Sequence, residues 1–259
     1  MATPPTVAAC QCVIDDLDVA SNRDRVAGIV RDLPAAVDLA VFPEGTLTGF
    51  VPDERIHDAA VARDGAAVAA VHEAATAAGC AVVVGFVEAA ADGYYNAAAY
   101  LDPDGDATVY RKRHLWATER ALLEPGAERV RIETPVGTAA ILTCYDLNFV
   151  AESAATATED LEVLLVPGAW PAASSENWRL LVRARALDGV RWAVAAGRTG
   201  RRTVDDAPAA TYAGRSLVAF PNGAVKEALT RAPGRIVSEL PPATLERARD
   251  RIGVFDGVS

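Results

Sequence analysis

Three short segments of the chain each contain a side chain that can take part in covalent chemistry. They are FPEG with Glu44, YRKRHL with Lys112 and LTCYD with Cys144. A thiol can attack a carbonyl carbon, a carboxylate can accept the thiol proton, and an ammonium group can stabilise charge on the carbonyl oxygen. Each residue alone is weak evidence, because a lone cysteine is usually an inert core residue. Only their combination points to nucleophilic hydrolysis.

Each of these residues follows a segment with the composition of a strand. DLAVFPEG is typical of a short buried strand that Pro43 and Gly45 end, which places Glu44 at its carboxyl edge. YYNAAAYLDPDGDATVYRK predicts a hairpin around Pro-Asp-Gly, with Lys112 where the hairpin ends. TAAILTCYD is an apolar strand that leads to Cys144. Ligands bind at the carboxyl edge of open α/β sheets, so we expect the three residues to converge there.

The remaining chain alternates between strand-like and helix-like segments. Helices are predicted over residues 16–33, 64–78 and 174–190, the second ending at a left-handed Gly79. Further strands are expected in TVAACQCVI, CAVVVGFVE, LEVLLVPGAW and RWAVAAG, and a second hairpin in GRSLVAFPNGAVKEAL. PPATLERARDR fits a short helix or a tail. The pattern predicts one α/β domain, and its two hairpins suggest a duplicated architecture.

With their flanking residues, the three reactive segments resemble the blocks of the nitrilase (carbon-nitrogen hydrolase) superfamily. The likeness extends through YNAAAYLDPDG before the lysine block, EPG after it, PGAW, WRLLVRARALD, and GRSLVAFPNG near the C-terminus. It implies a single carbon-nitrogen hydrolase domain over residues 1–259, folded as a four-layer α-β-β-α sandwich. It also implies a homodimer or higher homo-oligomer.

Amide hydrolysis through a thioester requires these residue types independently of the resemblance. Cys144 would be the nucleophile, and Glu44 the general base, with a pKa that we expect a desolvated pocket to raise. Lys112 and the Tyr145 N–H would stabilise the charge that develops on the carbonyl oxygen. No metal or organic cofactor is required. By the resemblance, Glu119 would help to position the lysine and the substrate.

The sequence departs from the family pattern where the substrate would be bound. Asn148 stands where an arginine is common, and Asp188-Gly189 replaces a usual Glu-Asn pair. Asn148 and Trp170 are candidates for the substrate pocket, although a polar cap and aromatic core packing explain them equally well. By the resemblance, CYD in place of the CWE of true nitrilases favours amides or N-carbamoyl compounds over nitriles.

Several alternative functions remain open at this level. The same triad would serve a true nitrilase, or an acyltransferase that passes the acyl group to an amine. A binding or regulatory protein could keep the fold without turnover. Cys10 and Cys12, two residues apart, would share one face of a strand, where a core role is favoured over a redox or metal-binding role.

Composition argues for a small-molecule partner in the cytoplasm. The formal net charge of −10 disfavours nucleic acid and acidic membrane surfaces, since both would repel the chain. The N-terminal MATPPTVAACQCVI lacks the basic start and apolar core of a secretion signal. Only two of the 25 basic residues, Lys112 and Lys226, are lysines. This profile fits a salt-adapted acidic surface, and a high-GC coding bias would also exchange lysine for arginine.

The acidic charge leads to a prediction about salt. At about 1 M salt the Debye length falls to about 3 Å, which screens the repulsion among surface carboxylates. We expect the urea midpoint of unfolding and the enzymatic activity to rise between low and molar NaCl. Equal stability at both salt concentrations would contradict a salt-adapted surface.

Overall fold

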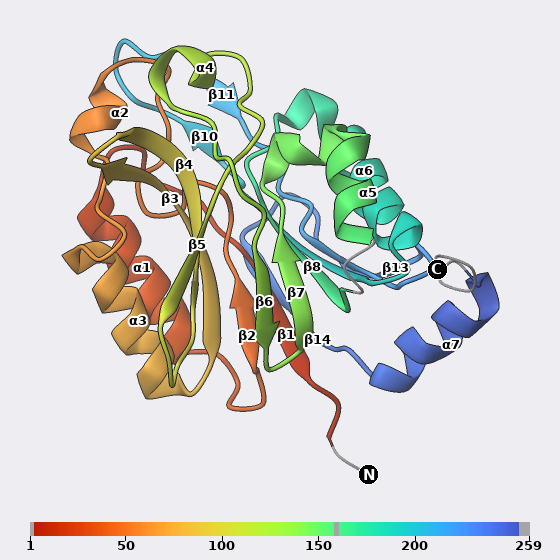
Figure 1. Ribbon diagram of the computed structural model, residues 1–259. Coiled ribbons are helices and arrows are strands. Elements are labelled where there is room, and N and C mark those ends of the chain that lie inside the picture. The colour runs from red at the N-terminus through yellow and green to blue at the C-terminus, as the bar shows by residue number, and fades with distance from the viewer. Residues whose placement is uncertain (1–2, 158–160, 254–259) are drawn as a thin grey trace.

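Two mixed sheets face each other in the computed structural model, which describes residues 3–157 and 161–253 (Figure 1). The first sheet has the order β14-β1-β2-β3-β4-β5. Its strands are β1 (Thr6–Gln11), β2 (Leu39–Val41), β3 (Ala81–Ala90), β4 (Gly93–Leu101), β5 (Ala107–Arg111) and β14 (Gly234–Glu239). The second sheet has the order β13-β12-β9-β8-β7-β6. Its strands are β6 (Arg131–Thr134), β7 (Gly137–Ile141), β8 (Val163–Gly168), β9 (Trp192–Gly197), β12 (Leu217–Ala219) and β13 (Val225–Ala228).

The two sheets repeat one pattern of strand directions. Strands β1, β2 and β3 run parallel, as do β7, β8 and β9, and antiparallel strands flank both groups. The two predicted hairpins are β4-β5 and β12-β13, which occupy corresponding places. This agrees with the duplicated architecture suggested by the sequence. The return of β14 to pair with β1, far away in the chain, was not predicted.

Helices cover the outer face of each sheet. On the first sheet lie α1 (Val19–Arg31) and α3 (Ala66–Ala78), and on the second lie α5 (Val150–Ala157) and α6 (Ser175–Asp188) (Figure 1). Alternate strand residues serve different layers: Val41 and Leu165 join the core between the sheets, whereas Val82 packs in the cluster that contains Val71 of α3. The expected four-layer α-β-β-α sandwich is confirmed.

The helix boundaries follow local capping. The first helix begins at Val19, three residues later than predicted, because the Asp18 side chain caps it by accepting from the Ser21 N–H. Helix α3 ends at Gly79 in the left-handed conformation, as expected (φ 62°). The segment predicted as a short helix or tail is helix α7 (Pro242–Ile252). Within the described ranges, no helix is long and apolar enough to cross a membrane.

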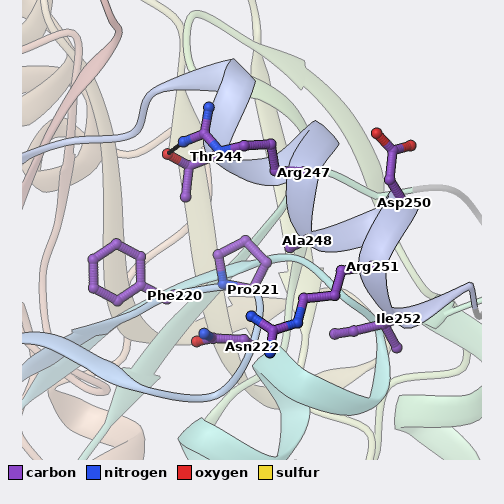
Figure 2. Close-up of a pocket in the computed structure, with 9 residues that line it drawn as sticks. All are labelled: Phe220, Pro221, Asn222, Thr244, Arg247, Ala248, Asp250, Arg251 and Ile252. Carbon is purple, nitrogen blue, oxygen red and sulfur yellow. Dashed lines mark hydrogen bonds between the residues drawn. The ribbon is translucent and has the colours of Figure 1, made fainter.

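Short elements complete the chain. They are α2 (Arg55–Asp58), α4 (Glu119–Leu122), β10 (Arg201–Arg202), β11 (Ala210–Thr211) and the 3-10 turns η1 (Cys144–Asn148) and η2 (Ala172–Ser174). Helix α7 and the turn between β12 and β13 line an open pocket of about 720 Å³ (Figure 2). Its lining includes Phe220, Asn222 and Arg251 but none of the three reactive residues.

A glycine in β3 allows the loop with Glu44 to lie directly against the sheet. A Cβ added at Gly85 would lie 2.6 Å from the Pro43 oxygen and 2.9 Å from the Glu44 Cα. The Gly85 carbonyl also accepts from the Leu47 N–H at 3.0 Å. The absence of a side chain at position 85 therefore helps to set the position of the Glu44 backbone.

We expect Gly85→Ala to lower the free energy of unfolding by about 1–3 kcal/mol, because the added methyl group collides with backbone atoms. Gly28→Ala in α1 is the matched control, since a Cβ there would meet nothing within 4 Å. The Gly28→Ala substitution should raise the free energy of unfolding by about 0.5–1 kcal/mol, because alanine favours the helix. Urea unfolding measures both variants, and an unchanged midpoint for Gly85→Ala would refute the packing argument.

Candidate active site

Glu44, Lys112 and Cys144 come together at one end of the two sheets. Glu44 follows β2, Lys112 follows β5, and Cys144 follows β7. These strands contribute their carboxyl ends to the same edge, where α4 and the β10-β11 pair also lie (Figure 1). All three side chains are buried; Lys112 is only 1% exposed. The site therefore draws residues from both sheets.

The Lys112 ammonium group lies between two buried carboxylates. Its Nζ is 2.7 Å from Glu44 Oε1 and 2.9 Å from Glu119 Oε2. The Asn96 amide nitrogen donates to both glutamates, at 2.8 Å to Glu44 and 2.7 Å to Glu119. Backbone N–H groups hold the opposite oxygens: Ala169 donates to Glu44 Oε2 at 2.9 Å, and the Trp116 N–H donates to Glu119 at 2.6 Å. Each carboxylate thus has several donors in place of water.

Cys144 begins the 3-10 turn that follows β7 and has a positive φ of 49°. A non-glycine residue rarely adopts this conformation, which costs energy and is characteristic of functional turns. The Glu44 carboxylate lies close enough for its charge to raise the pKa of the Cys144 thiol. The nucleophile and its candidate base are therefore neighbours in one buried site.

Asp146 connects the cysteine turn to the lysine segment. Its buried carboxylate accepts from the Thr143 N–H at 2.9 Å and from the Tyr110 hydroxyl at 2.7 Å. It also accepts from the His114 N–H at 2.9 Å, and His114 Nδ1 lies 3.0 Å away. These contacts give His114 a structural role, and its ring also stacks on Phe149.

Electrostatics favour a neutral thiol beside an ionised glutamate. Burial alone would raise the pKa of Glu44, but the Lys112 ammonium and hydrogen bonds from Cys144, Lys112 and Asn96 outweigh it, so the pKa is lowered. The expected rise in the Glu44 pKa was therefore wrong, because desolvation was considered without the buried cation. Burial and the adjacent Glu44 carboxylate raise the pKa of Cys144 well above its ordinary value.

Lys112 remains charged in the same environment. Burial would lower its pKa, but the Glu119 and Glu44 carboxylates raise it well above the ordinary value. At neutral pH the site therefore contains an ammonium group, an ionised general base and a protonated nucleophile.

The two candidate pocket residues lie in different environments. Trp170 is 8% exposed and belongs to the apolar cluster that includes Cys144 and Trp178. Asn148 is exposed, and its amide donates to the Tyr145 carbonyl within the cysteine turn at 3.2 Å. Contact of either residue with substrate stays a prediction. Tyr145 directly follows the nucleophile, in the first turn of a 3-10 helix, where N–H groups lack intrahelical acceptors.

Sequence reasoning missed three groups that hold the site together: Asn96, Asp146 and the Ala169 N–H. Asn96 and Asp146 lay inside segments that carried the family resemblance, but nothing in their spacing indicated their partners. A polar side chain in the otherwise apolar run YYNAAAYL was the available signal for Asn96. A backbone N–H such as that of Ala169 leaves no signal of residue type.

Within the described ranges, no group of three or more His, Cys, Asp or Glu residues is arranged to hold a metal ion.

Comparisons with known proteins show which sequences and folds this chain resembles. An (R)-stereoselective amidase from Pseudomonas sp is 31% identical over 234 residues, which cover 90% of this chain and 84% of the amidase. The structure of XC1258 from Xanthomonas campestris, described as a CN-hydrolase superfamily protein, has a TM-score of 0.90 at 25% identity and covers 100% of this chain and 98% of its own.

An amidase from Nesterenkonia sp. AN1, solved as a cysteine-to-alanine mutant with butyramide, is similar in fold. It has a TM-score of 0.81 at 23% identity, with 97% of this chain and 96% of that chain covered. The sequence model of the carbon-nitrogen hydrolase family matches residues 6–250. The chain therefore belongs to the carbon-nitrogen hydrolase family.

Proposed function

We propose that this carbon-nitrogen hydrolase cleaves the amide or N-carbamoyl bond of a small molecule through a cysteine thioester and releases ammonia. One observation carries the proposal: the buried Lys112 ammonium group pairs with the Glu44 carboxylate at 2.7 Å, and the buried Cys144 thiol lies close enough to that carboxylate for its charge to raise the thiol pKa. A nucleophile, a base and a cation thus meet in one desolvated site.

In the first half-reaction, Glu44 takes the thiol proton as Sγ attacks the carbonyl carbon. The new negative charge on the carbonyl oxygen is stabilised by Lys112 and the Tyr145 N–H. The C–N bond then breaks, and Glu44 returns the proton to the leaving nitrogen, which departs as ammonia. The acyl group remains on Cys144 as a thioester.

In the second half-reaction, Glu44 removes a proton from a water molecule, which attacks the thioester carbonyl. The same donors stabilise the second oxyanion. The C–S bond breaks, the thiolate recovers its proton from Glu44, and the acid product leaves. Lys112 stays protonated throughout, as its raised pKa requires. Every proton transfer in the cycle uses Glu44, and every step uses residues of this chain and water.

The comparisons support a linear amide as the substrate class. The Pseudomonas relative is an amidase, and the Nesterenkonia amidase was solved with butyramide, a short aliphatic amide. Trp170, which shares an apolar cluster with Cys144, would pack against the apolar part of such a substrate. Asn148 would contribute a neutral polar group close to the cysteine turn.

We expect Cys144→Ala to lower ammonia release by about a thousandfold or more, because no covalent intermediate can form. A panel of amides, carbamoyl compounds and nitriles would be assayed with both forms. The matched control is Cys80→Ala: this cysteine is also buried but lies in the cluster between the first sheet and its helices, and burial raises its pKa to about 12. Equal activity of Cys144→Ala and wild type would refute the proposal.

The pKa directions predict the pH profile of kcat/KM. Glu44 acts as a base only when ionised, and its pKa lies below the ordinary value of 4.5. The rate should therefore be flat through neutral pH and fall only below about pH 4.5, as protonation removes the base. Circular dichroism at each pH, with return to neutral pH, would separate this loss from unfolding. An acid limb near about pH 6 would instead indicate a raised pKa of the base.

A further inference from the structure

Asn96 connects the two glutamates of the site from the strand beside Lys112. Its Nδ2 lies 2.8 Å from Glu44 Oε1 and 2.7 Å from Glu119 Oε1. The side chain is 4% exposed, and its backbone carbonyl accepts from the Lys112 N–H at 2.7 Å. The amide and the ammonium group therefore reach the same two carboxylates from adjacent backbone positions.

The hydrogens of Asn96 and Lys112 can be assigned to individual acceptors, and this assignment leaves one Lys112 hydrogen without a carboxylate partner. An amide nitrogen carries two hydrogens, and Asn96 can direct one to each glutamate. An ammonium group carries three. One of them satisfies the 2.7 Å contact with Glu44, and a second lies between the Glu119 oxygens at 2.9 and 3.1 Å. The third is then available to a substrate oxygen.

Two carboxylates that share one cation also repel each other. In a dry site this repulsion favours protonation of one of them, which would remove the base. The Asn96 amide opposes the repulsion because it donates to both carboxylates without adding an acceptor between them. Its hydrogen bond is among the interactions that lower the pKa of Glu44.

We propose that Asn96 is a positioning residue of the hydrolase: it holds Glu44 and Glu119 side by side and so leaves one N–H of Lys112 free for the substrate oxygen. The inference rests on the proposed roles of Glu44 and Lys112. Asn96 itself acts only through these neighbours. Its loss would let the two carboxylates move apart and draw Lys112 further toward them, which lowers kcat with little effect on KM.

Several titratable groups lie near Glu44 and influence how its protonation changes with pH. Lys112 faces it from the end of β5, Cys144 from the cysteine turn, and Glu119 from α4 across the shared lysine. Tyr212, after β11, is close enough for the Glu44 charge to raise its pKa, an effect smaller than that of burial. Removing both Asn96 hydrogens takes one direct hydrogen bond from Glu44 and one from Glu119, and both carboxylates stay paired with Lys112. The bond to Glu44 is among the interactions that lower the pKa of that group.

The test uses Asn96→Leu, which keeps the approximate shape of the side chain without its donors, and Asn96→Ser, which keeps one donor. The readout is the rate at which iodoacetamide alkylates Cys144 as a function of pH, with the modified cysteine located by mass spectrometry. Alkylation needs no turnover, so it also tests the inference if amide hydrolysis proves to be wrong. In parallel, kcat and KM would be measured with the best amide substrate.

We expect the acid limb of alkylation to move up by about one pH unit in Asn96→Leu, with a smaller shift in Asn96→Ser. We also expect kcat to fall about ten- to a hundredfold while KM stays within about twofold. Tyr100→Phe, on the same strand, is the control and should keep the wild-type profile. If Asn96→Leu does not fold, the acid limb of alkylation and the kcat of Asn96→Ser test the proposal instead. A folded variant with the wild-type acid limb and kcat would overturn the proposal.

Discussion

The buried ammonium group of Lys112 imposes the main constraint on the site. A charge removed from water is costly unless partners replace its hydration, and Lys112 is 1% exposed. Glu44 and Glu119 supply the opposite charge, and their own burial then requires donors from Asn96, Ala169 and Trp116. The burial of one cation therefore requires the general base, its supporting carboxylate and the donors that hold both.

The facing sheets explain how these groups can be held so closely. Glu44 and Lys112 extend from the first sheet, whereas Cys144 and the Ala169 N–H belong to the second. Their positions relative to one another depend on the core between the sheets, which contains apolar residues from both. Asp146 adds a direct connection between the lysine and cysteine segments. Protein interiors are closely packed and deform little, so this shared core can maintain contacts of under 3 Å.

Much of the architecture could be predicted from local patterns. The Pro-Asp-Gly and Pro-Asn-Gly turns indicated both hairpins, and Gly79 indicated the end of a helix, because turn and cap geometry depends on a few adjacent residues. The pairing of β14 with β1 joins the two ends of the chain and has no local signal. The lowered pKa of Glu44 was likewise missed, because its sign depends on how close Lys112 lies after folding.

The sequence by itself determined the residue types of the chemistry, their places at strand ends and the family to which the chain belongs. These properties follow from short motifs and from hydrophobic periodicity, which are local in the chain. Only the tertiary structure decided that Asn96 bridges two glutamates, that Asp146 joins two segments and that Glu44 is ionised beside a neutral thiol. Each of these depends on distances between residues far apart in the sequence, and electrostatic and hydrogen-bond energies change steeply with those distances.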